Sequence, residues 1–222
     1  MAKFLFDIVG FDLDGTLLDT HRDLGAAVNH ALALAGRAPV AAAEVRGLIG
    51  GGAKKMLERA LSLTGGCQEG ELKPLYHELL RFYEANIAVH TRPFPGTAAM
   101  LDALADHGVK LAVVTNKFES FACRVLDELD LSRRFYTVIG GDTLGPGKAK
   151  PARDQLDEMI ARAGGGRAAY VGDTSYDTLA AKAAGIPSVA VSFGFNDLPV
   201  QDLGADAVID HFDQLIPVLE KL

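Results

Sequence analysis

The sequence predicts an α/β fold in which a doubly wound parallel sheet carries an inserted all-helical block. Two observations support this prediction. From about residue 97 onward, short apolar runs alternate with segments of helical spacing, which is typical of parallel strands joined by crossover helices. Between about residues 20 and 90, the chain instead shows helical spacing without a convincing strand. The sheet is therefore expected to be interrupted once, after its first strand.

The N-terminal part begins with a strand and continues into helices. Ile8–Phe11 is an apolar run that ends abruptly in Asp12-Leu13-Asp14-Gly15-Thr16, which indicates a buried strand followed by a tight loop. The inserted block is then expected to contain helices whose apolar residues share one face. These helices cover residues 21–35, 45–63 and 72–87, and Gly50-Gly51-Gly52 divides the second of them.

Strands and helices alternate through the rest of the chain. The expected helices cover residues 97–106, 120–130, 153–163 and 175–184. The expected strands are short apolar runs at residues 110–114, 136–139, 168–171, 188–191 and 207–209. Because a helix separates most pairs of strands, the strands are expected to run parallel.

Composition restricts the classes of partner. Of the 222 residues, 49% are hydrophobic, and the formal net charge is −7. This acidic balance argues against a broad nucleic-acid or anionic-membrane surface. Cys67 and Cys123 lack a paired spacing, and no apolar run is long enough for a membrane span. A small-molecule partner and a cytoplasmic location are therefore expected, and the oligomeric state is left open.

Polar residues follow the first four strands of the expected sheet. Ligands of open parallel sheets bind beyond the carboxyl ends of the strands, so these residues are the first candidates for a site. In chain order they are Asp12 and Asp14, then Thr115 and Asn116, then Lys148 and Lys150, and finally Gly172 and Asp173 with Asp177 just beyond.

Asp12 and Asp14 form the first acidic pair. Residues two apart in an extended segment point the same way, so both carboxylates can face one pocket. Gly15 lets the backbone turn close to a ligand. An isolated Asp-Gly sequence is more often an ordinary turn, but the matching acids later in the chain favour a functional interpretation.

Asp173 and Asp177 form the second acidic pair. Helix capping and the helix dipole would explain this pair if it stood alone. Four carboxylates at one edge would, however, repel one another. Two such charges 4 Å apart repel by about 4 kcal/mol at an effective dielectric constant near 20. A hard cation relieves this repulsion, and oxygen ligands favour Mg²⁺. Asp12, the backbone carbonyl of Asp14 and Asp173 are the expected ligands, with Gly15, Gly172 and Asp177 in supporting positions.

Thr115, Asn116 and Lys150 are the expected substrate-binding residues. A hydroxyl, neighbouring backbone N–H groups and an ammonium together bind phosphate oxygens well. Pro151 fixes the chain direction beside Lys150, which favours Lys150 over Lys148, although the sequence leaves both possible.

These groups together indicate covalent phosphoryl transfer. Asp12 is expected to attack phosphorus and form an aspartyl-phosphate, with Mg²⁺ and a lysine offsetting the charge. Asp14 is expected to protonate the departing alkoxide and then to activate the water that hydrolyses the intermediate.

Four ordered segments resemble the motifs of the haloacid dehalogenase-like superfamily. They are Asp12–Thr16, Val113–Asn116, Lys150-Pro151 and Gly172–Asp177. The resemblance covers essentially the whole chain. It implies a Rossmann-like core formed by residues 1–19 and 91–222 and a mobile helical cap formed by residues 20–90. The hinges are expected near Asp19-Thr20 and residues 91–95.

Within this superfamily, three parts of the chain are similar to the phosphoglycolate phosphatases of bacteria. They are Ile49–Ala53 with Glu58–Leu61, Tyr83–Asn86 with Thr91–Gly96, and Val114–Lys117. The similarity implies hydrolysis of 2-phosphoglycolate to glycolate and phosphate. Lys150-Pro151-Ala152-Arg153 departs from the Lys-Pro-x-Pro sequence common in such enzymes. A sugar phosphate, nucleotide or pyrophosphate substrate, or a phosphoglucomutase-like transfer, therefore stays open.

The cap is expected to select the substrate. The N–H groups of Gly50-Gly51-Gly52 precede a helix and can receive a substrate carboxylate. Arg46, Lys54 and Lys55 are nearby candidates for added positive charge, although a solvated helix face explains each of them equally well.

Three other classes of protein share parts of this pattern. A receiver-type signalling domain also combines acids, a threonine and a lysine, but its order differs and the helical block has no place in it. A P-loop nucleotide-binding protein requires Ser or Thr after Gly147-Lys148, where Ala149 stands. A scaffold that has lost catalysis is disfavoured because every expected catalytic group is present.

Overall fold

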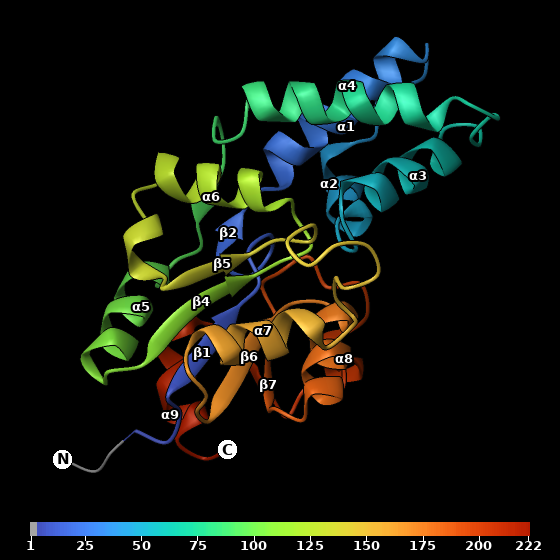
Figure 1. Cartoon of the computed structure of the whole chain (residues 1–222). Helices are drawn as coiled ribbons and strands as arrows, with labels where there is room; N and C mark the ends of the chain where they lie inside the picture. Colours follow the sequence, from blue (N-terminus) through green and yellow to red (C-terminus); the bar gives the residue numbers. More distant parts are fainter. Residues whose placement is uncertain (1–3) are drawn as a thin grey trace.

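The computed structural model describes residues 4–222 and contains a six-stranded sheet with helices on both faces (Figure 1). The strand order is β5-β4-β1-β6-β7-β8, and all neighbouring strands are parallel. The strands are β1 (Ile8–Phe11), β4 (Lys110–Val114), β5 (Thr137–Ile139), β6 (Ala168–Gly172), β7 (Ser188–Val191) and β8 (Ala207–Ile209). The doubly wound parallel sheet predicted from the alternating pattern is confirmed.

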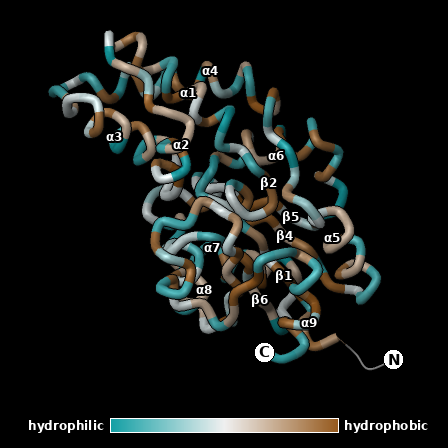
Figure 2. The backbone as a smooth tube through the Cα atoms, turned by 180° about the vertical axis from the view of Figure 1, so that it is seen from behind, coloured by the Kyte–Doolittle hydropathy of each residue, from teal (hydrophilic) through white to brown (hydrophobic). Residues whose placement is uncertain are grey.

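Helices cover both faces of this sheet. They are α5 (Thr97–Asp106), α6 (Glu119–Glu128), α7 (Asp154–Arg162), α8 (Ser175–Ala184) and α9 (Leu215–Leu219). Successive strand residues point to opposite faces. Ile8 accordingly packs in a cluster with α7 and α8, whereas Val9 and Phe11 belong to a larger cluster that includes α5, α6 and α9. The hydrophobic colour in Figure 2 is concentrated along these central strands.

Four helices between β1 and α5 pack against one another, and we call them the helical unit. They are α1 (His21–Leu34), α2 (Ala42–Val45), α3 (Ala53–Leu63) and α4 (Leu72–Ala85). In Figure 1 they lie together at the top of the molecule, away from both chain ends. The helix expected over residues 45–63 is divided: a 3₁₀ turn covers Arg46–Leu48, and the glycines separate it from α3.

The chain crosses twice between the sheet and the helical unit. Here β2 (Leu18–Asp19) and β3 (Arg92–Pro93) form an antiparallel pair, which the sequence analysis did not predict. The Phe94 N–H also donates to the Leu17 carbonyl at 3.0 Å. The two segments in which hinges were expected are therefore hydrogen-bonded to each other.

The remaining elements are short. The 3₁₀ turns at Ser132–Arg134, Val200–Asp202 and Phe212–Gln214, like α9, were not predicted. Across residues 4–222, no helix combines the length and the apolar character that a bilayer crossing would need.

Candidate active site

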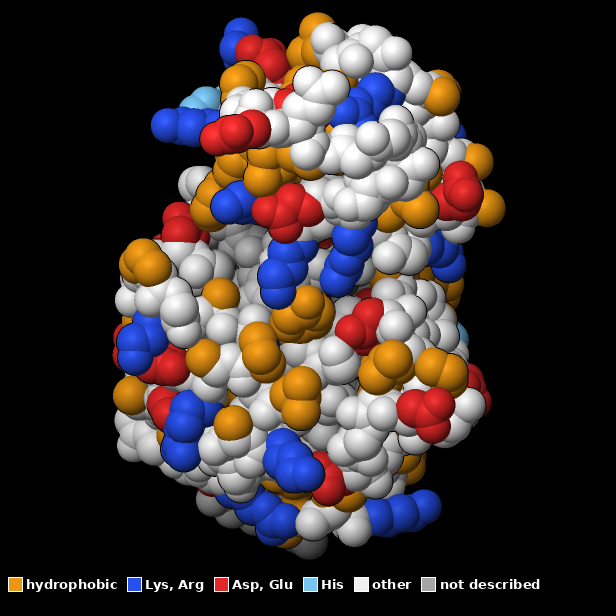
Figure 3. Space-filling model, turned by 90° about the vertical axis from the view of Figure 1, so that its right-hand side faces the viewer, with side chains coloured by type: hydrophobic (Ala, Val, Ile, Leu, Met, Phe, Trp, Pro, Cys, Tyr) orange, Lys and Arg blue, Asp and Glu red, His pale blue; other side chains and the backbone are white. Residues whose placement is uncertain are grey.

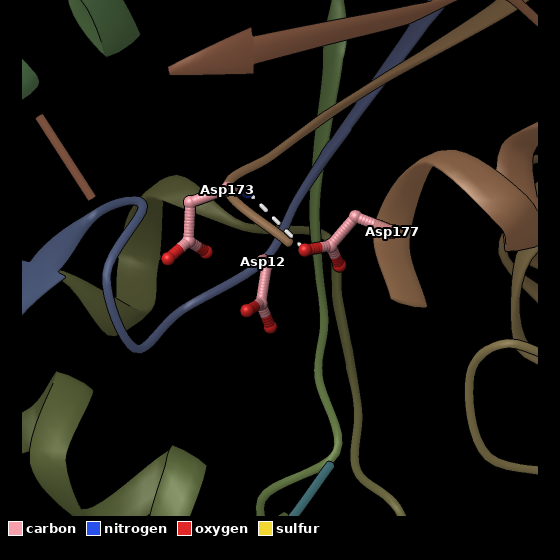
Figure 4. A group of neighbouring side chains, drawn as sticks. All are labelled: Asp12, Asp173 and Asp177. Carbon is pink, nitrogen blue, oxygen red and sulfur yellow. Dashed lines mark hydrogen bonds between the residues drawn. The ribbon is translucent and has the colours of Figure 1, made fainter. Parts of the chain in front are cut away.

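Three carboxylates come together where β1 and β6 end. Asp12 directly follows β1, Asp173 directly follows β6, and Asp177 lies in the first turn of α8. One oxygen from each lies within 4.8 Å of the others. In Figure 4 the carboxylate of Asp12 lies between the other two side chains. The parallel register of β1 and β6 causes this meeting, because it pairs Phe11 with Val171 and brings both strand ends to one edge.

Asp12 lies in a buried position beside a lysine. The residue is 8% exposed, and its Oδ1 lies 2.9 Å from Nζ of Lys150. Burial raises the pKa of Asp12 to about 6, with Lys150 opposing the rise and Asp177 and Asp14 adding to it. A carboxylate with this pKa is ionised at neutral pH.

Lys150 connects Asp12 to the rest of the site. Its ammonium contacts Asp177 Oδ1 at 2.6 Å and donates to the Val114 carbonyl at 3.0 Å and to the Tyr170 hydroxyl at 2.7 Å. Burial alone would lower the pKa of Lys150, but Asp12 and Asp177 outweigh it and raise the pKa above its ordinary value. The ammonium is therefore charged and held in one position.

Lys148, the alternative to Lys150 in the sequence, lies elsewhere. Its side chain is 51% exposed and forms an ion pair with Asp154. The Lys150-Pro151 peptide bond is cis, and the Lys150 N–H donates to Gln155 Oε1 at 3.0 Å. The structure thus brings Lys150 to the acids and leaves Lys148 on the surface.

Asp173 is fully buried, and protein donors orient both its oxygens. Thr16 Oγ1 donates to Oδ1 at 2.9 Å, and the Phe195 N–H donates to Oδ2 at 2.7 Å. Burial, with Asp177 and Asp12 adding to it, raises the pKa of Asp173 well above its ordinary value. A Cβ on Gly15, where φ is +89°, would lie 2.2 Å from Asp173 Oδ2, so this position requires glycine.

Asp177 supports the site and caps α8. Its Oδ2 accepts hydrogen bonds from the N–H groups of Asp173 and Thr174 and from the Thr174 hydroxyl, at 3.2, 2.9 and 2.7 Å. A Cβ on Gly172 would lie 2.4 Å from the Asp177 Cβ, so the close approach depends on glycine. Thr174 is the N-cap residue of α8, as one alternative interpretation predicted, and the Asp177 carboxylate both completes this cap and holds Lys150.

Asp14 is not part of the cluster formed by the other three acids. Its carboxylate pairs with the ammonium of Lys117, at 2.8 and 3.0 Å from the two oxygens. The sequence analysis did not assign a role to Lys117, although it stands two residues after Thr115 in a stretch already singled out. Lys117 also lies 4.6 Å from the ring centre of Tyr83 on α4.

Thr115 and Asn116 occupy the loop that follows β4. Thr115 is buried, and its hydroxyl oxygen accepts a hydrogen bond from the Lys117 N–H at 3.3 Å. Asn116 Nδ2 donates to the Lys150 carbonyl at 2.9 Å. Both residues line the pocket described next, and the Asn116 side chain also fixes the Lys150 loop.

A pocket of about 350 Å³ lies between these loops and the helical unit. Its core side is formed by the loops after β1, β4 and β6 and by Lys150, and its other side by α3, α4 and the Gly50–Gly52 turn. Figure 3, which views the side of α3 and α8, shows basic side chains across the narrow junction of the two parts. The pocket is open to a small molecule and has Asp12 at its wall.

The acidic cluster fits a hard cation. Among the described residues, Asp12 Oδ1 has no well-oriented hydrogen bond, although Lys150 lies close to it. Burial, with the neighbouring carboxylates adding to it, raises the pKa values of Asp12 and Asp173, and a bound cation would favour their charged forms. Oxygen-only ligands of this kind suit a divalent cation of the Mg²⁺ class.

The chain is similar to known proteins over most of its length. The chain is 43% identical over 216 residues to a phosphoglycolate phosphatase of Agrobacterium fabrum, covering 96% of this chain and 92% of that protein. It is 42% identical to a phosphoglycolate phosphatase of Caulobacter vibrioides, covering 92% and 86%. The crystal structure of a predicted phosphoglycolate phosphatase from Haemophilus somnus has a TM-score of 0.89 at 28% identity, covering 96% and 97%.

The family assignment rests on a match over most of the chain. Residues 9–191 match the family model of the haloacid dehalogenase-like hydrolases, and this range contains all the residues of the site. The chain belongs to the haloacid dehalogenase-like hydrolase family.

Proposed function

We propose that the protein is a Mg²⁺-dependent phosphatase that hydrolyses 2-phosphoglycolate to glycolate and phosphate. The observation that carries the proposal is the meeting of Asp12, Lys150 and Asp173, of which Asp12 and Lys150 line the pocket. The names of relatives at 43% and 42% identity supply the substrate. We also propose that the protein is cytoplasmic and that residues 20–90 form a cap.

Asp12 is the proposed nucleophile. One of its oxygens forms a bond to phosphorus while the bond from phosphorus to the ester oxygen breaks, which leaves an aspartyl-phosphate and an alkoxide. The Lys150 ammonium stands 2.9 Å from Asp12 and can stabilise the negative charge of the transferred group. Water then attacks phosphorus, which releases phosphate and restores the Asp12 carboxylate.

Asp14 is the proposed acid and base. It gives its proton to the alkoxide and afterwards accepts a proton from the attacking water. Lys117 holds the Asp14 carboxylate at 2.8 Å. The first step therefore requires Lys117 to move away from Asp14 or to find another partner.

The proposed metal ligands are Asp12, Asp173 and the backbone carbonyl of Asp14. Asp177 is a weaker candidate because its Oδ1 pairs with the Lys150 ammonium and its Oδ2 already accepts three hydrogen bonds, whereas each oxygen of Asp173 accepts one. When bound, Mg²⁺ would neutralise part of the charge shared by the carboxylates and the substrate phosphate.

A kinetic panel tests the proposed substrate. Phosphate release is measured with Mg²⁺ for 2-phosphoglycolate, sugar phosphates, nucleotides and pyrophosphate, and 2-phosphoglycolate should have the highest kcat/KM. Asp12→Asn should abolish turnover and keep the circular dichroism spectrum of the wild type, because it removes the nucleophile and little volume. Lys148→Met, which changes a surface lysine, serves as the control and should keep wild-type turnover.

Two results would count against this proposal. If 2-phosphoglycolate ranked near the bottom of the panel, the substrate would be wrong and the phosphatase assignment would stand. Wild-type turnover by the Asp12→Asn protein would refute the nucleophile.

A further inference from the structure

Lys117 is a buried cation at the pocket whose only contact in the proposed mechanism is with Asp14. Within residues 4–222, Lys117 and Lys150 are the buried lysines, and both line the pocket. Lys150 contacts Asp12, where the phosphate is proposed to bind. The Lys117 side chain is 5% exposed. Keeping a second ammonium out of water is costly unless it has partners, so its surroundings are informative.

The backbone holds Lys117 toward the helical unit. The Gly141 N–H donates to the Lys117 carbonyl at 2.8 Å, and the Lys117 N–H donates to Thr115 Oγ1. The ammonium then lies between Asp14 and the ring of Tyr83. Burial alone would lower the pKa of Lys117, but Asp14 and Tyr83 outweigh it and raise the pKa, so the group stays charged.

The Tyr83 hydroxyl is a donor without an acceptor. The residue is 2% exposed, and among the described residues its oxygen has no hydrogen-bond partner. Burial raises the pKa of Tyr83 to about 12, with Lys117 partly opposing the rise, so the hydroxyl keeps its proton at neutral pH. A buried hydroxyl without a partner is costly, and a ligand oxygen in the pocket would satisfy it.

Lys117 and Tyr83 lie where the part of the substrate beyond the phosphate is expected. If Asp14 protonates the ester oxygen, that oxygen must lie beside Asp14. In 2-phosphoglycolate the carboxylate carbon is two bonds from the ester oxygen, and Lys117 is already within hydrogen-bond distance of Asp14. We infer that Lys117 and Tyr83 form the subsite that binds the substrate carboxylate, an inference that rests on the proposed phosphatase function.

The other cations near the pocket are less suited to this task. Lys54 and Lys55 line the pocket but are exposed, so solvent screens their charge. Lys55 also contacts the Tyr176 hydroxyl at 3.2 Å. Arg46 lies 3.5 Å from Asp19 and over the ring of Phe195. A buried ammonium beside a hydroxyl without a partner distinguishes a substrate with a carboxylate from one without it more strongly than Lys54, Lys55 or Arg46 can.

The subsite also gives Lys117 the alternative partner that the first catalytic step requires. When the ammonium pairs with the substrate carboxylate, its hold on Asp14 weakens, and Asp14 can turn to the ester oxygen. A substrate with a carboxylate thereby releases the acid, whereas a simple phosphate ester leaves Asp14 paired with Lys117.

Binding measurements test the subsite independently of turnover. In the Asp12→Asn protein with Mg²⁺, calorimetry compares 2-phosphoglycolate with ethyl phosphate, which lacks the carboxylate. Lys117→Met should weaken 2-phosphoglycolate binding about a hundredfold and Tyr83→Phe about tenfold, because each removes a buried partner of the carboxylate. The affinity for ethyl phosphate should change less than about threefold in both variants. Arg81→Met, which removes an exposed cation of the same helix outside the pocket, is the control and should leave the ratio of the two affinities unchanged.

The outcomes separate the subsite from the proposed function. Equal losses for both esters would show that Lys117 serves only Asp14 or packing, and would overturn the inference. Failure of the Asp12→Asn protein to bind 2-phosphoglycolate would also overturn it. If 2-phosphoglycolate bound through Lys117 and the wild-type protein released no phosphate from it, the phosphatase proposal would fail and the subsite would stand.

Discussion

Two buried lysines give different environments to the two carboxylates that follow β1. Asp12 faces Lys150, Asp173 and Asp177 in a crowded acidic cluster, and its pKa is raised to about 6 mainly by burial. Asp14 pairs with Lys117 at 2.8 Å. The two carboxylates therefore have different ionic partners, in agreement with their different proposed roles.

The raised pKa of Asp12 predicts how Mg²⁺ binding depends on pH. Without metal, a carboxyl group whose folded pKa lies above its ordinary value of 3.8 stabilises the fold at pH values below 3.8, and this stabilisation is lost as pH rises through about 6. A proton on Asp12 also competes with the cation. Mg²⁺ should therefore raise the melting temperature more at pH 7.5 than at pH 5, as measured by thermal denaturation with and without the metal.

Asp12→Asn is the matched control for this prediction because asparagine does not titrate. The variant should show a smaller Mg²⁺ effect that differs less between the two pH values. A wild-type protein whose Mg²⁺ stabilisation was equal at pH 5 and pH 7.5 would contradict the assignment of Asp12 as a ligand with a raised pKa.

The sequence predicts single residues well where strand ends fix them. Asp12 and Asp173 were predicted to meet because the carboxyl ends of parallel strands meet at one edge, and Lys150 was favoured over Lys148 because Pro151 follows it. Lys117 and Tyr170 were not identified. Tyr170 lies inside an apolar strand, and nothing in the sequence distinguishes a tyrosine that holds Lys150 from one that only packs. Lys117 depends on the approach of α4, which no local pattern reveals.

At the scale of elements, one buried acid secures the return from the helical unit. Asp23 on α1 is 2% exposed. It accepts hydrogen bonds from the N–H groups of His90 and Thr91, at 2.9 and 2.8 Å, and from the Thr91 hydroxyl at 2.8 Å. These contacts tie the first helix after β2 to the residues just before β3. Asp23 therefore fixes how the two crossings lie beside each other.

Replacing Asp23 should destabilise the protein. Asp23→Ala leaves two backbone N–H groups and one hydroxyl without their acceptor, and the free energy of unfolding should fall by about 3 kcal/mol in urea denaturation. Asp23→Asn keeps one acceptor oxygen and should cost about half as much. The exposed Asp127→Ala on α6 is the control and should change stability by less than about 0.5 kcal/mol. A loss for Asp23→Ala no larger than this control would show that the crossing does not depend on Asp23.

Element prediction succeeded where a hydrophobic period was long enough to detect. The strands of the sheet were found because helices bury both faces and make them continuous apolar runs. β2 and β3 were missed because two residues show no period, and only their pairing defines them. α9 has five residues and was missed for the same reason.

At the scale of the whole molecule, the pocket belongs to two parts of the chain at once. The core supplies the acids and Lys150, and the helical unit supplies α3, α4 and the Gly50–Gly52 turn. The sequence predicted both parts, but it could not predict which side chains meet across the junction. Those contacts, such as Lys117 with Tyr83, depend on the angle between the parts, which is set by tertiary packing.

Substrate entry should require the two parts to separate. Lys55 on α3 contacts Tyr176 of the core beside the pocket. In a Cys67→Ser, Cys123→Ser background, which removes both cysteines of the chain, joining Lys55→Cys to Tyr176→Cys with a short bis-maleimide should lower kcat at least about tenfold, because product release needs the junction to open. Each single-cysteine variant treated with the same reagent controls for modification of the pocket rim. Unchanged turnover by the joined protein, with cross-linking shown by mass spectrometry, would mean that substrate reaches Asp12 without any movement of α3. An equal fall in kcat in the single-cysteine controls would mean that the attached reagent, and not the link between α3 and the core, lowers turnover.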